Sequence, residues 1–207
     1  MILRIPTQEI KKIGQHLDHL TKWLTRTQAS KPQILDKYQI DKIPSQVTVL
    51  GKYQYEIHTT FDTIEKAIGN LSKGIINLVL PNQVDVYEQR KLVRNLSSKL
   101  IAKTFKPLVI DKVNRLNNKH FQKEIKGISL RYNSTNWGSC SVKGRINLST
   151  RSLLLPEETF DYILVHELSH LLEMNHSKRF WRIVEQVMPT YKKHEAYIKT
   201  HSAKIDF

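Results

Sequence analysis

The chain has 207 residues, 40% of them hydrophobic and 25% charged, so it is long enough to bury a sizeable core. A single cysteine excludes an intramolecular disulfide, and no apolar run is long enough for a signal peptide or a membrane span, which predicts a cytoplasmic protein without membrane association. The formal net charge of +14 is compatible with acidic partners such as nucleic acids or acidic polypeptides.

The N-terminal part of the chain has the pattern of a helix followed by strands. Apolar residues at helical spacing predict an amphipathic helix over residues 7–28 that serves packing. Strand character follows at 47–50, 53–58 and 75–80. We interpret residues 1–85 as a smaller N-terminal portion, which supplies a sheet edge or a lid, and residues 86–207 as the core that carries the chemistry.

A basic segment follows. Residues 86–130 contain 11 basic and 3 acidic residues, and their apolar spacing predicts two helices, 86–105 and 107–121, with basic outer faces. Such a face can neutralise phosphates, so non-specific DNA or RNA is a candidate partner. The candidate contacts are Lys99, Lys103, Lys119 and Lys123. A solvated lysine-rich surface without a partner explains the same composition, and no aromatic residues are interleaved for base stacking.

The segment from residue 128 to residue 149 predicts strands beside the site. An alternating strand at 128–132 precedes a hairpin that turns at 143–144 and continues through 145–149. An edge strand beside a peptidase site lets an extended substrate add as a further strand. The candidate substrate-binding residues are Trp137, Gly138, Ser139 and Tyr191. For Trp137, core packing is the favoured interpretation over a wall of a substrate subsite.

One motif has the spacing of a specific chemistry. His166 and His170 stand four residues apart on a predicted helix that starts near Pro156, so both imidazoles share one face and can bind one Zn²⁺. Glu167 lies about 100° around the helix, where it can act as general base on a metal-bound water. A purely structural zinc site in a nucleic-acid-binding module would have no need for that carboxylate.

A third histidine follows the motif. His176 can reach the same metal only if the helix stops first, and Asn175 is the expected stop because asparagine tolerates the left-handed conformation. Ser177 is then expected to cap a further helix running to Met188. The predicted three-histidine site leaves one coordination position open, which is the arrangement of catalytic zinc.

Other roles near the motif stay open on the residues alone. Cys140 is a buried small residue or, as in peptide deformylases, a third zinc ligand in place of His176. Glu173 or Glu185 is a candidate to orient a ligand histidine. The candidates for stabilising the oxyanion are Tyr191, His194, Arg182 and Tyr197.

The chain also resembles a known family, the YgjP-like zinc metallopeptidases, which are related to the SprT and WLM groups. The resemblance is dense from Leu130 to Trp181, through Asn136-Trp137-Gly138-Ser139-Cys140-Ser141, Gly144-Arg145-Ile146-Asn147-Leu148 and HELSHLLEMNHSKRFW. It implies an α+β, zincin-like fold with an antiparallel hairpin beside the HExxH helix. It also implies His166, His170 and His176 as ligands and Glu167 as catalytic base.

The chain departs from related patterns at two places. Metzincins share the histidine spacing but carry glycine where this chain has Glu173, which argues against that group. The family's usual N-terminal antiparallel strands could come only from residues 1–5. The sequence therefore predicts a metallopeptidase that uses one Zn²⁺ to hydrolyse polypeptides.

Overall fold

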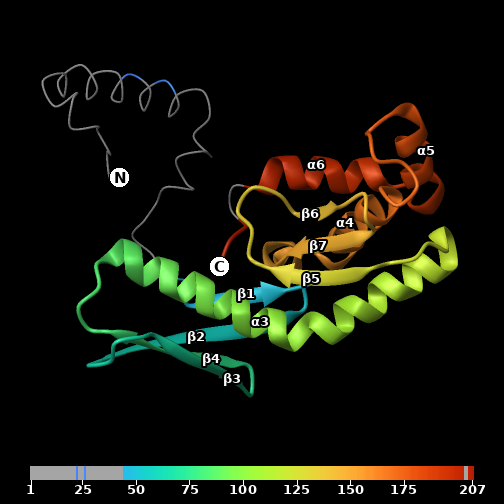
Figure 1. Cartoon of the computed structure of the whole chain (residues 1–207). Helices are drawn as coiled ribbons and strands as arrows, with labels where there is room; N and C mark the ends of the chain where they lie inside the picture. The colour runs from blue at the N-terminus through green and yellow to red at the C-terminus, as the bar shows by residue number, and fades with distance from the viewer. Residues whose placement is uncertain (1–21, 23–25, 27–43, 203–204) are drawn as a thin grey trace, which may run out of the picture. The chain divides into compact units, whose positions relative to one another are not determined.

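The computed structural model describes residues 22, 26, 44–202 and 205–207. The chain divides into two compact units, residues 1–42 and 43–207, and every helix and strand with described bounds belongs to the second (Figure 1). The predicted helix over residues 7–28 lies outside the described residues, apart from two helical positions, and so do residues 1–5.

The second unit begins with a four-stranded sheet. Its strands are β1 (Gln46–Val49), β2 (Tyr53–Asp62), β3 (Ile68–Ser72) and β4 (Ile75–Pro81). The spatial order is β1-β2-β4-β3, with β2 and β4 parallel and the other pairs antiparallel. The three predicted strands are present, and β3 is an addition. The sequence pattern did not indicate β3 because it contains Gly69 and Asn70, and both residue types are depleted in strands.

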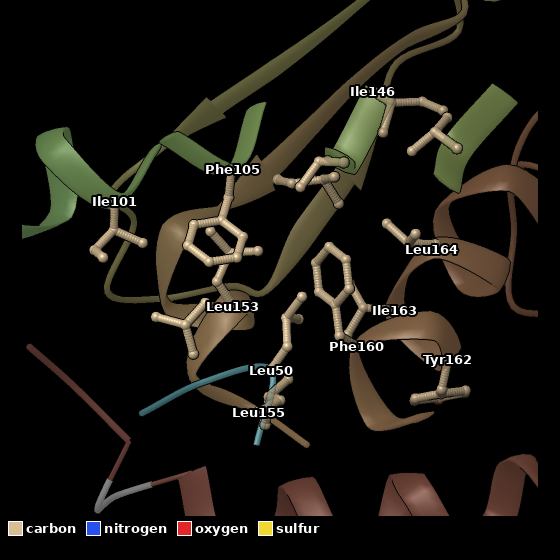
Figure 2. Close-up of a cluster of buried hydrophobic side chains, with 14 of the residues drawn as sticks. Leu50, Ile101, Phe105, Ile146, Leu153, Leu155, Phe160, Tyr162, Ile163 and Leu164 are labelled. Atoms are coloured by element: carbon tan, nitrogen blue, oxygen red, sulfur yellow. The ribbon is translucent and has the colours of Figure 1, made fainter. Parts of the chain in front are cut away.

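The turn between β1 and β2 ties this sheet to the core. Leu50 and Gly51 both have positive φ, at 53° and 70°, the backbone signature of a tight hairpin. Leucine is unfavourable there, but its side chain is buried, and Figure 2 shows it among the core residues beside Leu155 and Phe160. The buried side chain offsets the unfavourable backbone conformation.

A long helix, α3 (Val86–Leu116), replaces the two helices predicted for the basic segment. The prediction of a break before Pro107 is wrong, because the helix continues through the proline and bends instead, as Figure 1 shows. A proline inside a helix removes one hydrogen bond, and burial of Phe105 and Val109 on either side stabilises the continuous form. A five-residue π-turn, η2 (Asn117–Phe121), ends the segment.

A second, three-stranded sheet lies next to the helix that carries the histidines. It consists of β5 (Gly127–Arg131), β6 (Gly138–Cys140) and β7 (Arg145–Ser149), in the order β5-β7-β6. β6 and β7 form the predicted antiparallel hairpin, and β5 pairs with β7 in parallel. β6 is therefore an edge strand.

Three helices complete the unit after a 3₁₀ turn, η3 (Thr150–Leu154). They are α4 (Glu157–Ser169), α5 (Lys178–Val187) and α6 (Tyr191–His201). Pro156 is the N-cap of α4, one residue before the predicted position. Figure 2 shows Phe160, Tyr162 and Leu164 of α4 among the buried apolar side chains. Tyr162 also stacks on His194 of α6, with ring centroids 6.2 Å apart.

The predicted α+β class, with a hairpin beside the HExxH helix, is confirmed. Residues 43–85 belong to the same compact unit as residues 86–207, and a functional division at residue 85 stays a prediction. Among the helices that the structure describes, none has the length and apolar character needed to cross a membrane.

Candidate active site

The first two histidines are positioned by α4. His166 and His170 share one face of the helix, with ring centroids 5.0 Å apart. Phe180 of α5 packs against both rings, with centroid distances of 4.9 and 4.5 Å. His170 is buried and His166 is half-buried. These contacts restrict the rotamers of both imidazoles, as a site that binds one ion requires.

The helix ends earlier than predicted. α4 stops at Ser169, and the chain then turns, with the Leu172 N–H donating to the Ser169 carbonyl at 3.0 Å. Asn175 was expected to end the helix in the left-handed conformation. That expectation is wrong, because Asn175 does not have a positive φ and lies in the turn beyond the helix end. The tightened bonds after Ser169 end the helix in its place.

The turn brings the third histidine back to the first. His176 Nε2 lies 2.9 Å from His166 Nε2. The Ser177 side chain then accepts a hydrogen bond from the Phe180 N–H, so that Ser177 is the N-cap of α5, as predicted. The fold thus brings together three histidines that a continuous helix would have separated.

The three rings can offer nitrogens to one ion. One ligand atom from each of His166, His170 and His176 lies within 4.8 Å of the other two, the single group of this kind in the described part of the chain. Burial lowers the pKa of His166 to about 3, and charge on the other two imidazoles acts in the same direction. Burial also lowers the pKa of His170. Neutral imidazoles have free lone pairs, so this donor set fits a zinc ion.

His170 is oriented by a backbone group. Its Nδ1 lies 3.1 Å from the Glu173 carbonyl oxygen, which directs Nε2 toward the other histidines. The expectation that a Glu173 or Glu185 carboxylate would do this is not met for His170. The Glu173 carboxylate lies 3.9 Å from Arg179 Nε, and Glu185 is exposed on α5.

Glu167 is held in an apolar setting against the edge strand. The residue is 5% exposed, and burial raises the pKa of its carboxyl to about 8. Its Oε2 has no hydrogen-bond partner among the described residues. A Cβ added at Gly138 of β6 would lie 2.6 Å from Glu167 Oε1, so only glycine leaves room for this side chain. A buried carboxylate oxygen without a partner suits a proton acceptor that meets its partner in the working site.

A cavity of about 300 Å³ opens beside Glu167, and we call it the Glu167 cavity. It is formed by three separate segments: the loop into β6, the middle of α4 and one side of α6. The residues that line it are Thr135, Asn136, Trp137, Gly138, Tyr162, Ile163, His166, Glu167, Glu195 and Ile198. Its size lies at the lower end for ligand sites.

The four candidate substrate-binding residues separate into two pairs. Trp137 and Gly138 line the Glu167 cavity, and the Trp137 ring also packs on the Arg151 guanidinium, 4.6 Å away. Ser139 is exposed on β6 and does not line the cavity. Tyr191 is buried, stacks on Trp181 with centroids 5.4 Å apart, and does not line it either.

The four candidates for the oxyanion are placed away from the cavity. His194 is buried, and its Nδ1 lies 3.1 Å from the Thr159 hydroxyl, while Arg182 is exposed. Tyr197 stacks on His201 with centroids 4.1 Å apart. None of these three residues lines the Glu167 cavity, and Tyr191, the fourth candidate, does not line it either.

Tyr162 was not singled out from the sequence. Its ring lies 6.0 Å from the His166 ring and lines the Glu167 cavity. Burial raises the pKa of its hydroxyl, and the Glu195 charge adds to the increase, so that the group stays protonated and able to donate. Its position four residues before His166 was an available signal.

Cys140 does not join the histidines. Its Sγ donates to the Ser141 carbonyl at 3.6 Å, and it is not part of the compact histidine group. Burial, together with the nearby Glu167 charge, raises the pKa of the thiol to about 11, which keeps it protonated. A protonated thiol is a poor nucleophile, and the position of Cys140 outside the histidine group argues against a ligand role.

The four lysines proposed to contact nucleic acid are all exposed. The prediction that the basic residues of segment 86–130 lie on outer faces of its helices included Lys112, and for this residue it is wrong. Its Nζ lies 2.8 Å from Asp161 and 2.9 Å from Glu157, both on α4. The lysine therefore ties α3 to α4 rather than facing a partner.

Comparison with known proteins supplies a family and two solved structures. A family model described as the YgjP-like metallopeptidase domain matches residues 1–201. The metallopeptidase zymogen abylysin of Pyrococcus abyssi is 34% identical, with a TM-score of 0.41, over 44% of this chain and 92% of that chain. The metallopeptidase zymogen jannalysin of Methanocaldococcus jannaschii is 22% identical, with a TM-score of 0.40, over 44% and 94%. No curated protein matches the chain.

Proposed function

The chain belongs to the YgjP-like metallopeptidase family, and from this we propose that it hydrolyses peptide bonds with one zinc ion held by His166, His170 and His176. The observation that carries the proposal is the compact histidine group next to a buried, unpartnered Glu167 carboxylate. A metal-dependent peptidase follows from the family. The identity of the metal, its ligands and the role of Glu167 are the parts we propose.

A zinc ion in such a site polarises a carbonyl and lowers the pKa of a coordinated water to about 7. Glu167 accepts the proton of the attacking water and returns it to the leaving amine. Burial of the carboxyl raises its pKa, which helps it to hold the proton between the two transfers. The Glu173 carbonyl fixes the ring of His170 throughout.

The substrate is a polypeptide in an extended conformation. β6 is the edge strand next to Glu167, so its free backbone groups can pair with a peptide that adds to the sheet. Trp137 then walls the cavity into which one substrate side chain enters. Tyr162 is the candidate side chain to donate to the oxyanion, since it lines the same cavity and its hydroxyl stays protonated.

The test replaces the base without touching a ligand. Glu167→Gln should retain zinc and the fold but lose hydrolysis of casein or of a peptide library by at least about 100-fold, the usual weight of a general base. Metal content is measured by mass spectrometry and the fold by circular dichroism. Glu65→Gln, an exposed change in the loop after β2, is the matched control. Hydrolysis by Glu167→Gln at the wild-type rate would contradict the proposal.

A further inference from the structure

The Glu167 cavity has a one-sided charge. Its walls are apolar at Tyr162, Ile163 and Ile198, and the two acidic side chains in its lining are those of the buried Glu167 and the exposed Glu195. No lysine or arginine is among the described residues that line it. Apolar walls with a carboxylate suit a side chain that has a methylene stem and a cationic head.

The Glu195 carboxylate can pair with the cationic head of such a substrate side chain. It lies on α6, is exposed, and forms no hydrogen bond or ion pair within the part of the chain that the structure describes. Lys192 and Lys199 stand one turn away on the same helix without pairing with it. By contrast, Glu157 of α4 pairs with Lys52 at 2.6 Å.

The opposite end of β6 carries the opposite charge. A hollow of about 430 Å³, which we call the Lys143 hollow, lies beside His170 and the turn after β6. Three lysines line it, Lys123, Lys126 and Lys143, with Glu124 as the one acidic member. The Lys126 ammonium pairs with Glu124, which leaves a net positive lining. A cationic substrate side chain is therefore disfavoured at this end and favoured at the other.

The direction of β6 relates the two ends to the scissile bond. β6 runs from Gly138, at the Glu167 cavity, to Cys140, near the Lys143 hollow. A peptide that pairs with it in the more stable antiparallel sense runs the other way. Its residues after the scissile bond then lie at the Glu167 cavity.

We propose that Glu195 makes this protein prefer a lysine or arginine immediately after the scissile bond, by pairing with that side chain in the Glu167 cavity. The inference rests on the proposed peptidase function and adds its substrate class. Because Glu195 is exposed, the pair is worth a modest preference, about threefold to fivefold over glutamine, and it weakens as salt rises.

The test compares quenched fluorescent peptides that differ only in the residue after the cut: lysine, glutamine or glutamate. Wild type should show the threefold to fivefold lysine-over-glutamine ratio in kcat/KM, Glu195→Gln should bring the ratio to about one, and Glu195→Lys should favour the glutamate peptide. Glu65→Gln removes the same charge from an exposed loop and should leave the ratio unchanged. A wild-type ratio near one, or a ratio that Glu195→Gln does not lower, overturns the inference while the peptidase function stands.

Binding gives a readout that does not depend on turnover. In the Glu167→Gln background, fluorescence anisotropy should show the lysine peptide binding more tightly than the glutamine peptide, and adding Glu195→Gln should remove the difference. Equal binding of both peptides before that addition contradicts the inference. If the zinc-loaded wild type cleaves neither casein nor any peptide of the set, the proposed function fails, and the inference fails with it.

Discussion

The two sides of Glu167 are built in different ways. On the histidine side, the three candidate ligands come from 11 consecutive residues, 166–176, on one helix and the turn that follows it. On the cavity side, the lining comes from three segments, 135–138, 162–167 and 195–198. The histidine side is thus set by local geometry, and the cavity side by packing between distant elements. We expect changes on the first to affect metal binding and changes on the second to affect catalysis and selectivity.

The largest expected effect is at the third ligand. His176→Ala should lose zinc on dialysis against a mild chelator and lower kcat/KM by more than about 100-fold, because loss of even an outer partner of a ligand costs up to that much. Cys140→Ser should keep about one zinc per chain, since Cys140 does not belong to the histidine group. The reverse result, with metal lost in Cys140→Ser and kept in His176→Ala, supports a deformylase-like site instead.

Gly138→Ala tests the boundary between the two sides. The new Cβ would lie 2.6 Å from Glu167 Oε1 and 2.8 Å from its Cδ, so the carboxylate must move. A displacement of about 1 Å at a catalytic group can cost about 100-fold in rate, whereas metal content should not change. The measurements are kcat/KM and zinc content.

Gly127→Ala on β5 is the control for this change. The Cβ added there meets only Arg145 Nη1, at 3.9 Å, and the backbone does not have a positive φ. It should leave kcat/KM within about twofold. If Gly138→Ala is equally harmless, the close packing of Glu167 on β6 has no part in catalysis.

A pH experiment separates the anchoring of α4 from the chemistry. Hydrogen bonds from Lys52 and Lys112 lower the pKa of Glu157, at the start of α4, to about 2. A carboxyl with a lowered folded-state pKa stabilises the fold above its unfolded value of about 4.5, and this contribution is lost as the pH falls toward 2. Because the side chain is 35% exposed, Glu157→Gln should lower the free energy of unfolding at pH 7 by only about 1 kcal/mol.

Urea denaturation at pH 7 and at pH 3 measures this difference between wild type and Glu157→Gln. The difference in free energy of unfolding between the two proteins should be smaller at pH 3 than at pH 7. A difference of the same size at both values would mean that the two lysines do not act through the charge of Glu157.

The smallest expected effect on peptide hydrolysis belongs to the exposed lysines. Replacing Lys99, Lys103, Lys119 and Lys123 together by glutamine should leave kcat/KM unchanged for short peptides that have no charged side chain before the scissile bond, because Lys123 also lines the Lys143 hollow. If these lysines contact phosphates, the slope of log affinity for DNA against log salt should flatten by up to about 3–4 units. An unchanged slope places the contacts elsewhere, and no DNA binding at low salt supports a solvated surface without a partner.

Part of the fold could be predicted because its signals are short in range. The strands at 47–50, 53–58 and 75–80, the β6–β7 hairpin and the Ser177 cap follow from alternation and capping chemistry. The continuous α3 could not be predicted, because a proline's local cost was outweighed by burial of neighbouring side chains. β3 was missed for the same kind of reason. A Cβ at Gly69 would lie 2.6 Å from Leu78 Cδ2, so glycine lets the buried Leu78 side chain pack closely there.

The sequence alone determined that His166 and His170 share one face, because residues four apart on a helix do so in any fold that keeps the helix. The return of His176 depends on where that helix ends, and the structure places this end at Ser169. Only the tertiary structure placed Glu195 of α6 and Trp137 of the loop into β6 around one cavity, and placed Tyr191 and Ser139 outside it. Glu195 and Trp137 are 58 residues apart in the chain, and no local spacing relates them. Contacts between distant segments depend on how complete elements pack, which is decided by the sum of many weak apolar contacts rather than by a motif.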